Sequence, residues 1–338
     1  MTKEQIDKLL SEGRFPEPTG KRKLVETHIS WVILCDEFVY KIKKPIQYSF
    51  LDFSTLEQRK HFCERELELN QRFSEGIYLE VLPIYKQQRN YRIGGKEGTQ
   101  VDYALKMRKL DPEKQMDVLL GQNRVSETDI KKLAQRIVDF HKNTRIIHKK
   151  NVLDIGEQFN DLALEKEHIS KQLASEYGRF IDSAIRASDT FLSKNKKLLN
   201  DRLTSGFYRD CHGDLHTRNI FLLPEPQPFD CLEFNDDYRK IDVLNEVAFL
   251  CMDLDAMGRT ELSDLFIEAY NHLLPTLQTE SESRLFLYYK SYRANVRAKV
   301  NSLRAKNAAS NSERKNALRE VKKYLDLMES YMELLYIK

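Results

Sequence analysis

The sequence predicts an α+β fold in which a small antiparallel β-rich lobe precedes a larger, mostly helical lobe. Two observations lead to this prediction. Residues 23–110 are dominated by short segments of β-type pattern, with one helical segment embedded among them. After residue 111 the apolar positions recur at helical spacing, apart from one hairpin-like stretch. We therefore expect a helical appendage at 1–22, a β-rich lobe at 23–110 and a helical lobe at 111–338.

Composition limits the classes of protein that need to be considered. A chain of 338 residues, 41% of them hydrophobic, can bury a sizeable core. Its 55 basic and 52 acidic side chains leave a net charge of +3, which gives no reason to expect a nucleic-acid partner. No signal peptide or membrane-length apolar run is visible, so we expect a cytoplasmic protein without a membrane partner. Five scattered cysteines without a Cys-x-x-Cys pair argue against disulfides and structural zinc.

The β-rich lobe begins with three short strands, expected at 24–25, 29–34 and 38–43. Side chains alternate along a strand, so Lys41 and Lys43 of the third strand point to the same face. Two lysines side by side on one strand face are the first candidate functional feature.

A helix is expected to follow from Ser54, with Thr55 and Gln58 as a capping box. The helix carries two acidic candidates, Glu64 and Glu66. Two more strands are then expected at 79–85 and 101–110. Between them, the glycine-rich run 94–99 lacks the Gly-x4-Gly-Lys-Ser/Thr spacing and a following helix, so we interpret it as a hairpin turn and not as a phosphate loop.

The helical lobe shows amphipathic patterns at 127–142, 155–202, 242–257, 260–275, 281–307 and 312–336. We interpret 242–252 as core packing with Asp242 as its only chemically functional residue. Arg293, Arg297 and Lys299 fit a solvated helix face or a basic patch that binds an acceptor. The last helix repeats apolar residues at heptad spacing, which fits docking on the same chain or a homodimer through this helix.

The strongest signal is the loop from Cys211 to Asn219, which leads into the apolar run 220–223. A proline-rich turn and the segment 229–234 follow, so we expect a hairpin with carboxylates and a carboxamide at one end. Such oxygen ligands suit magnesium better than zinc. A His-x-Asp-x-His metal site at 212–216 is the alternative, but the sequence shows no second His/Asp cluster to complete it.

A strand lysine, a helix glutamate, an Asp-x4-Asn loop and a later carboxylate, in this order, are the parts used for phosphoryl transfer from ATP. Residues 212–219 read His-Gly-Asp-Leu-His-x-x-Asn in full. The chain therefore resembles the protein-kinase-like fold and, within it, the aminoglycoside phosphotransferase and choline kinase superfamily, over roughly 23–300. Segments 26–31, 40–45, 51–56 and 229–236 resemble more narrowly an uncharacterised bacterial branch often fused to a P-loop ATPase domain, which we do not expect in this chain.

The resemblance implies roles for the loop residues. Asp214 would accept the proton of the attacking hydroxyl or orient that hydroxyl. His212 would brace the loop, and Asn219 would bind magnesium through its amide oxygen. The second magnesium ligand is left open between two carboxylates. Asp230 is favoured because it precedes Asp242 by 12 residues, a spacing similar to that of the family, while Glu233 stands in a local pattern that also resembles the family's.

The resemblance also implies a nucleotide site in the β-rich lobe. Lys41 would bind phosphate, with Lys43 as the alternative on the same face. Glu66, or less favourably Glu64, would pair with that lysine. The lobe has no glycine-rich loop, so hydroxyls such as those of Thr27 and Ser30 would contact ATP instead.

The expected function is an ATP- and Mg²⁺-dependent phosphotransferase that moves the γ-phosphate to a hydroxyl of a small molecule, with the acceptor bound by the helical lobe. One alternative is a non-catalytic kinase-like module that binds nucleotide or acts as a scaffold. A protein kinase is disfavoured because no Asp-Phe-Gly with a following Ala-Pro-Glu is present. The residues leave open the acceptor, the oligomeric state and the preference for ATP or GTP.

Overall fold

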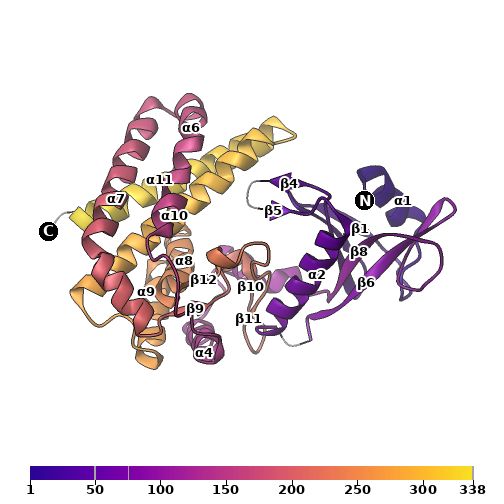
Figure 1. Cartoon of the computed structure of the whole chain (residues 1–338), viewed down its shortest axis with the longest axis horizontal. Coiled ribbons are helices and arrows are strands. Elements are labelled where there is room, and N and C mark those ends of the chain that lie inside the picture. Colours follow the sequence, from indigo (N-terminus) through magenta and orange to yellow (C-terminus); the bar gives the residue numbers. More distant parts are fainter. Residues whose placement is uncertain (49–50, 75, 337–338) are drawn as a thin grey trace. The chain divides into compact units, whose positions relative to one another are not determined.

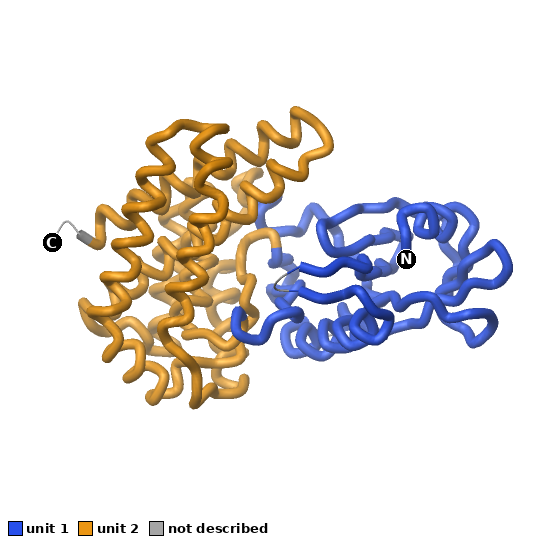
Figure 2. Tube along the Cα trace, turned by 45° about the horizontal axis from the view of Figure 1, so that its top comes forward, with its two compact units in different colours: residues 1–119, 219–238 blue, residues 120–218, 239–338 orange. Residues whose placement is uncertain are grey.

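The computed structural model describes residues 1–48, 51–74 and 76–336. The chain forms two compact units (Figure 2), of which unit 1 comprises residues 1–119 and 219–238 and unit 2 comprises residues 120–218 and 239–338. The stretch 219–238 packs with the β-rich unit, whereas the sequence placed it in the helical lobe at 111–338. The boundary therefore follows packing and not the order of the chain.

Unit 1 is built on a six-stranded antiparallel sheet with the order β1-β2-β3-β8-β6-β7 (Figure 1). The strands expected from the sequence are confirmed, and one further strand, β7, was not predicted. Their bounds are β1 Lys23–Glu26, β2 Ser30–Leu34, β3 Phe38–Lys43, β6 Tyr78–Gln87, β7 Asn90–Ile93 and β8 Thr99–Arg108. A separate short pair is formed by β4 Gln47–Tyr48 and β5 Leu51–Asp52.

The glycine-rich run after β7 does not form the predicted hairpin turn. Strands β7 and β8 both pair with β6, on opposite sides of it, so residues 94–98 cross from one side of β6 to the other. At Gly98 the backbone has a φ of 101°, and a Cβ atom would meet the carbonyl oxygen of Lys86 at 2.4 Å. Only glycine fits this close crossing, which explains the glycines without a phosphate-binding role.

Two helices pack on this sheet. Helix α2 (Leu56–Gln71) contacts β6 and β8. Of the predicted capping box, the structure shows the half in which the Thr55 side chain accepts the backbone N–H of Gln58. Helix α1 (Lys3–Glu12) begins with a capping box of Thr2 and Gln5. Its Ile6 and Leu9 are fully buried in one cluster with side chains of the sheet, so α1 belongs to this core and is not an appendage.

The hairpin after the 211–219 loop is shorter than predicted. Strands β10 (Ile220–Phe221) and β11 (Gln227–Pro228) pair antiparallel, but the expected strand at 229–234 does not form. Asp230 has a φ of 60°, in the left-handed region, and this conformation ends the extended run. The segment 229–234 is therefore a loop anchored by specific hydrogen bonds.

Unit 2 is mostly helical, and the helices predicted at 127–142, 242–257, 260–275, 281–307 and 312–336 are confirmed. The segment 155–202, expected to hold one or two long charged helices, is instead divided into two short helices, a 3-10 turn and one long helix. Helix α8 packs against α9 and α10, α4 against α9, and α11 along α10 (Figure 1). The apolar seam of α11 is buried within the unit, which corresponds to docking on the same chain. Among the described residues, no helix has both the length and the apolar character needed to cross a membrane.

The helices of unit 2 are α4 Glu127–Asn143, α5 Asp154–Asn160, α6 Lys166–Gln172, α7 Ser175–Thr204, α8 Val243–Ala256, α9 Thr260–Leu273, α10 Glu280–Lys306 and α11 Asn311–Tyr336. Helix α3 (Met116–Gly121) lies at the boundary between the units. A short pair, β9 (Tyr208–Asp210) with β12 (Lys240–Asp242), frames the loop 211–218. Asp242 caps α8 and forms ion pairs with Arg202 at 2.6 and 2.9 Å, a structural role.

Candidate active site

In unit 1, Lys41 and Lys43 of β3 both contact the carboxylate of Glu66 in α2. The Lys41 Nζ lies 2.7 Å from Glu66 Oε1, and the Lys43 Nζ lies 2.7 Å from Oε2. This geometry follows from the strand alternation, which places both lysines on one face. Glu64, the alternative acid, instead lies on the exposed side of α2 and pairs with Lys60 at 3.6 Å.

The two competing carboxylates of the 229–234 loop are both part of the same cluster. Asp230 Oδ1 lies 2.7 Å from Lys41 Nζ, and Glu233 Oε1 lies 2.5 Å from Lys43 Nζ. The Asp230 side chain is 42% exposed and that of Glu233 is 5% exposed. The structure therefore forms two parallel lysine–carboxylate pairs that share Glu66, and Asp230 is the more accessible of the two loop carboxylates.

The backbone around Asp230 is held from two elements of unit 1. The Asp230 N–H donates to the Tyr78 hydroxyl at 2.9 Å, and the Cys231 N–H donates to Asn70 Oδ1 at 2.8 Å. The Phe229 N–H donates to the carbonyl of Asn219 at 3.0 Å, which places Asn219 beside the residue that precedes Asp230. The backbone of Asn219 is thus held one residue away from Asp230.

The charges of this cluster shift one another's ionisation. Burial lowers the pKa of Lys41 and Lys43, but the carboxylates beside them more than compensate and raise both pKa values above their usual range. Burial raises the pKa of Glu66, but the two lysines outweigh it and lower that pKa to about 2. Burial dominates at Glu233 and raises its pKa although Lys43 opposes it. Both lysines therefore carry their charge at neutral pH.

The lowered pKa of Glu66 predicts how the stability of the fold depends on pH. A carboxylate with a lower pKa in the folded state stabilises the fold above about pH 4.5, and this contribution is lost as the pH falls from 4.5 toward 2. Glu66→Gln removes the contribution, so the difference in unfolding free energy between wild type and variant should shrink over that range. Urea unfolding of both proteins at pH 5 and pH 3 measures this difference. A difference that stays constant between the two pH values would contradict an ionised Glu66 paired with the lysines.

Thr27 and Ser30, the expected substitutes for a glycine-rich loop, close the turn between β1 and β2. The Ser30 N–H donates to Thr27 Oγ1 at 2.9 Å. Ser30 is opposite Lys43 in the register of β2 and β3, and its hydroxyl is buried without a hydrogen-bond partner among the described residues. Ser30 is therefore next to the lysine cluster, whereas the Thr27 side chain is engaged in the turn.

In unit 2, the loop 211–218 is anchored by two acidic side chains of α8. The Glu246 carboxylate accepts the backbone N–H groups of His212 and Gly213, the latter at 3.1 Å. Asp253 Oδ2 accepts the N–H of Thr217 at 3.0 Å and its hydroxyl at 2.6 Å. The interpretation that Asp242 is the only chemically functional residue of this segment was therefore wrong. Glu246 and Asp253 lie seven residues apart, on one side of a mostly apolar helix.

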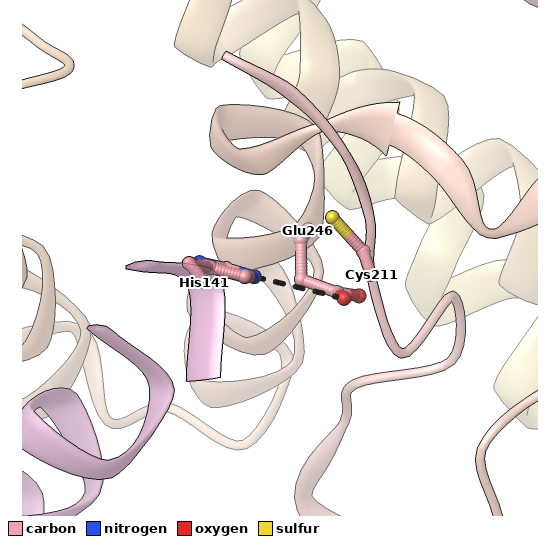
Figure 3. A group of neighbouring side chains, drawn as sticks. All are labelled: His141, Cys211 and Glu246. Carbon is pink, nitrogen blue, oxygen red and sulfur yellow. Dashed lines mark ion pairs between the residues drawn. The ribbon is translucent and has the colours of Figure 1, made fainter. Parts of the chain in front are cut away.

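Glu246 is also one of three potential ligand groups that the fold gathers, with His141 of α4 and Cys211 (Figure 3). Their ligand atoms lie within 4.8 Å of one another. The His141 Nδ1 bonds to the Tyr270 hydroxyl at 2.7 Å, and Nε2 lies 3.9 Å from Glu246. Burial lowers the pKa of His141 despite the carboxylate. Because the Glu246 oxygens already accept two backbone N–H groups, we interpret the cluster of His141, Cys211 and Glu246 as a support for the loop 211–218.

Asp214 is the partly exposed member of the loop, with 39% of its side chain accessible. Its N–H donates to His212 Nδ1 at 3.3 Å, so His212 braces it from within. The His216 Nε2 lies 3.4 Å from Asp214 Oδ2. Burial raises the pKa of Asp214, but His216, Arg297 and His212 outweigh it and hold that pKa well below its usual range. Asp214 is therefore ionised at neutral pH, as a proton acceptor must be.

Helix α10 carries the arginines for which the sequence predicts a solvated helix face or a basic patch. Arg293 and Arg297 are buried, and only Lys299 is partly exposed, in an ion pair with Asp161 at 3.2 Å. Arg293 donates to Asn245 Oδ1 at 2.8 Å and to the carbonyl of Gly213 at 3.3 Å. Both arginines lie on a mostly buried stretch of the helix. This position is the signal that could have distinguished them from residues of a solvated face.

Solved structures share this fold. The chain resembles a choline kinase from Cryptosporidium parvum (TM-score 0.56, 11% identity, 93% of this chain and 90% of that one). It resembles an ethanolamine kinase from Plasmodium vivax (TM-score 0.55, 9% identity, 92% and 84%). It also resembles the GDP and kanamycin complex of the aminoglycoside phosphotransferase APH(2")-IIIa (TM-score 0.51, 10% identity, 94% of each). The chain thus shares with these solved structures a protein-kinase-like fold, in which an antiparallel sheet and a larger helical part are combined.

Among curated proteins, the chain is 31% identical over 285 residues to uncharacterized proteins of Mycobacterium tuberculosis and Mycobacterium bovis. The match covers 82% of this chain and 54% of theirs, so the chain spans about half the length of the curated relatives it matches. No family model matches the chain.

Proposed function

We propose that this chain is an ATP- and Mg²⁺-dependent phosphotransferase that moves the γ-phosphate to a hydroxyl of a small molecule. The observation that carries the proposal is Asp214, a partly exposed and ionised carboxylate in a loop otherwise immobilised by Glu246, Asp253 and Arg293. The kinase-like fold supports it. In this proposal unit 1 is the nucleotide-binding lobe, and unit 2 is the catalytic and acceptor-binding lobe.

In the proposed reaction the acceptor oxygen forms a bond to the γ-phosphorus, while the bond from that phosphorus to the β–γ bridging oxygen breaks. The nucleoside diphosphate leaves with the electron pair of the broken bond, and the hydroxyl proton passes to Asp214. Because phosphoryl transfer has a loose transition state, orienting the hydroxyl contributes as much to this role as basicity does. His216 lies against the Asp214 carboxylate, and His212 holds the Asp214 backbone N–H.

The donor set in unit 1 fits magnesium. Asn219 and Asp230 offer the carboxamide and carboxylate oxygens that this ion prefers. Asp230 is favoured over Glu233 because its side chain is 42% exposed, whereas Glu233 is 5% exposed and paired with Lys43. When bound, the ion would neutralise charge on the transferred phosphate.

We assign different roles to the two lysines because their side chains differ in exposure. Lys41 is 13% exposed and bridges Glu66 and Asp230, so it is the lysine we assign to phosphate binding. Lys43 is fully buried between Glu66 and Glu233, and we assign it to positioning these carboxylates. In both assignments Glu66 fixes the lysines.

Substitution of the proposed magnesium ligands should raise the Mg²⁺ requirement. We expect Asn219→Ala and Asp230→Ala each to increase the Mg²⁺ concentration for half-maximal activity by about tenfold, because each removes one oxygen ligand. Titration of turnover and of nucleotide affinity with Mg²⁺ measures this. Glu233→Gln is the matched control and should leave the requirement unchanged. If Glu233→Gln raises the Mg²⁺ requirement and Asp230→Ala does not, the choice of Asp230 over Glu233 as the magnesium ligand is wrong.

The function itself is tested by release of nucleoside diphosphate from ATP with Mg²⁺, over a panel of amino alcohols, sugars, nucleosides and candidate protein acceptors. We expect acceptor-dependent release with at least one small-molecule class. Nucleotide binding without turnover for any acceptor would favour the non-catalytic module, and phosphorylation of protein alone would favour a protein kinase.

A further inference from the structure

Arg297 of α10 is a buried cation that forms no ion pair with any carboxylate in the described ranges. It is 9% exposed, and its Nε has no hydrogen-bond partner among the described residues. Within the described part of the chain no carboxylate forms an ion pair with it. The Tyr324 hydroxyl accepts a hydrogen bond from its guanidinium, and Asp253 and Asp214 favour its charge from a longer distance. Its guanidinium lies 5.3 Å from the centre of the Tyr324 ring. A buried charge without an ion pair is costly, and such charges are expected where a charged ligand binds.

A second arginine extends this cationic site along the same face of α10. The Asn301 side chain donates to the carbonyl of Arg297 at 2.9 Å, and Arg304 donates to Asn301 Oδ1 at 3.0 Å. Arg304 is exposed and likewise has no ion pair among the described residues. Partial burial and the like charges of Arg218 and Arg297 lower the pKa of Arg304, although Glu320 and Glu313 oppose this. Like charges are therefore gathered here.

This site is close to Asp214 within unit 2. His216 Nε2 lies 3.4 Å from Asp214 Oδ2 and 3.5 Å from Arg297 Nη1, so the carboxylate and the guanidinium are at most about 7 Å apart. A hydroxyl that meets Asp214 would belong to a molecule whose other end, only a few bonds away, reaches Arg297.

We propose that Arg297 and Arg304 bind an anionic group, a phosphate or a carboxylate, on the acceptor whose hydroxyl meets Asp214. This inference rests on the proposed function and narrows its substrate class to alcohols that carry a negative charge, such as hydroxy acids and phosphorylated polyols. A guanidinium binds both groups through paired hydrogen bonds. Cationic alcohols such as choline and ethanolamine would be repelled by the same arginines.

The direct test is calorimetric binding of matched small alcohols to the full chain. Glycerol 3-phosphate and glycerate are the anionic probes, glycerol is the neutral one and ethanolamine the cationic one. We expect the anionic probes to bind at least about tenfold more tightly than the others, and less tightly as salt is added. Equal or tighter binding of glycerol or ethanolamine would overturn the proposal.

Variants assign the binding to these arginines. Arg304 is exposed, so Arg304→Ala should fold normally and weaken the binding of the anionic probes about tenfold. Arg297→Lys keeps the charge but loses the paired hydrogen-bond geometry, so it should weaken their binding as well. Lys299→Ala is the matched control, since it removes one cation from the same helix that is already paired with Asp161. If Lys299→Ala weakens the binding of the anionic probes equally, the effect comes from net charge, and the assignment of the anion site to Arg297 and Arg304 is overturned.

Two further outcomes separate this inference from the proposed function. If Arg304→Ala raises KM for ATP and leaves KM for the anionic acceptor unchanged, the arginines serve the transferred phosphate of the nucleotide, and the acceptor assignment is overturned. If anionic probes bind and the arginine variants lose them, but no probe is ever phosphorylated by the wild type, the anion site is supported while the proposed phosphotransfer fails.

Discussion

Asp214→Asn is expected to lower kcat by roughly two to four orders of magnitude, the contribution typical of a positioned acid or base. Asparagine has the same size but cannot accept the hydroxyl proton. The backbone of the loop should be unaffected, because Glu246 and Asp253 hold it through its N–H groups and not through the Asp214 side chain. Steady-state release of nucleoside diphosphate measures the loss.

The control for this variant has two parts. The thermal unfolding midpoint and the nucleotide affinity of Asp214→Asn should remain close to those of wild type, since its side chain is 39% exposed. Asp201→Asn, an exposed position in α7, removes one carboxylate from the same unit and should leave kcat unchanged. Turnover of Asp214→Asn within a factor of a few of wild type would exclude the assignment of Asp214 as proton acceptor.

Lys43→Ala is expected to destabilise the protein by roughly 3–5 kcal/mol, the range for removing one partner of a buried ion pair. Lys43 is fully buried between Glu66 and Glu233, which are 0% and 5% exposed, so its removal leaves Glu233 without this lysine and Glu66 with Lys41 alone. Chemical denaturation measures the loss. Lys41→Ala should cost less stability, because its other partner Asp230 is 42% exposed, and should chiefly weaken nucleotide binding.

Lys60→Ala is the matched control for Lys43→Ala. Lys60 pairs with Glu64 on the exposed side of α2, and the side chains are 48% and 54% exposed. Exposed pairs of this kind contribute about 0–1 kcal/mol. If Lys43→Ala and Lys60→Ala unfold at the same denaturant concentration, the buried cluster does not stabilise the fold as its geometry indicates.

Local pattern predicted most of the elements and several positions of the candidate site. The period of two in β3 placed Lys41 and Lys43 on one face, and both do reach the same acid. Periodicity failed where a single backbone conformation decided the outcome. The left-handed φ of Asp230 ended the expected strand at 229–234, and the crossing of β6 by residues 94–98 replaced the expected hairpin turn.

The sequence by itself determined the α+β class, the strand face of the two lysines and the motif His-Gly-Asp-Leu-His-x-x-Asn, because these depend on neighbours a few residues apart. Only the tertiary structure decided that Asp230 pairs with Lys41 and Glu233 with Lys43, since these partners lie 189 and 190 residues apart. It also revealed that Glu246 and Asp253 anchor the loop 211–218 and that Arg297 is buried. Their charges are buried in helices, and a buried charge acquires its role from the groups that the fold brings against it.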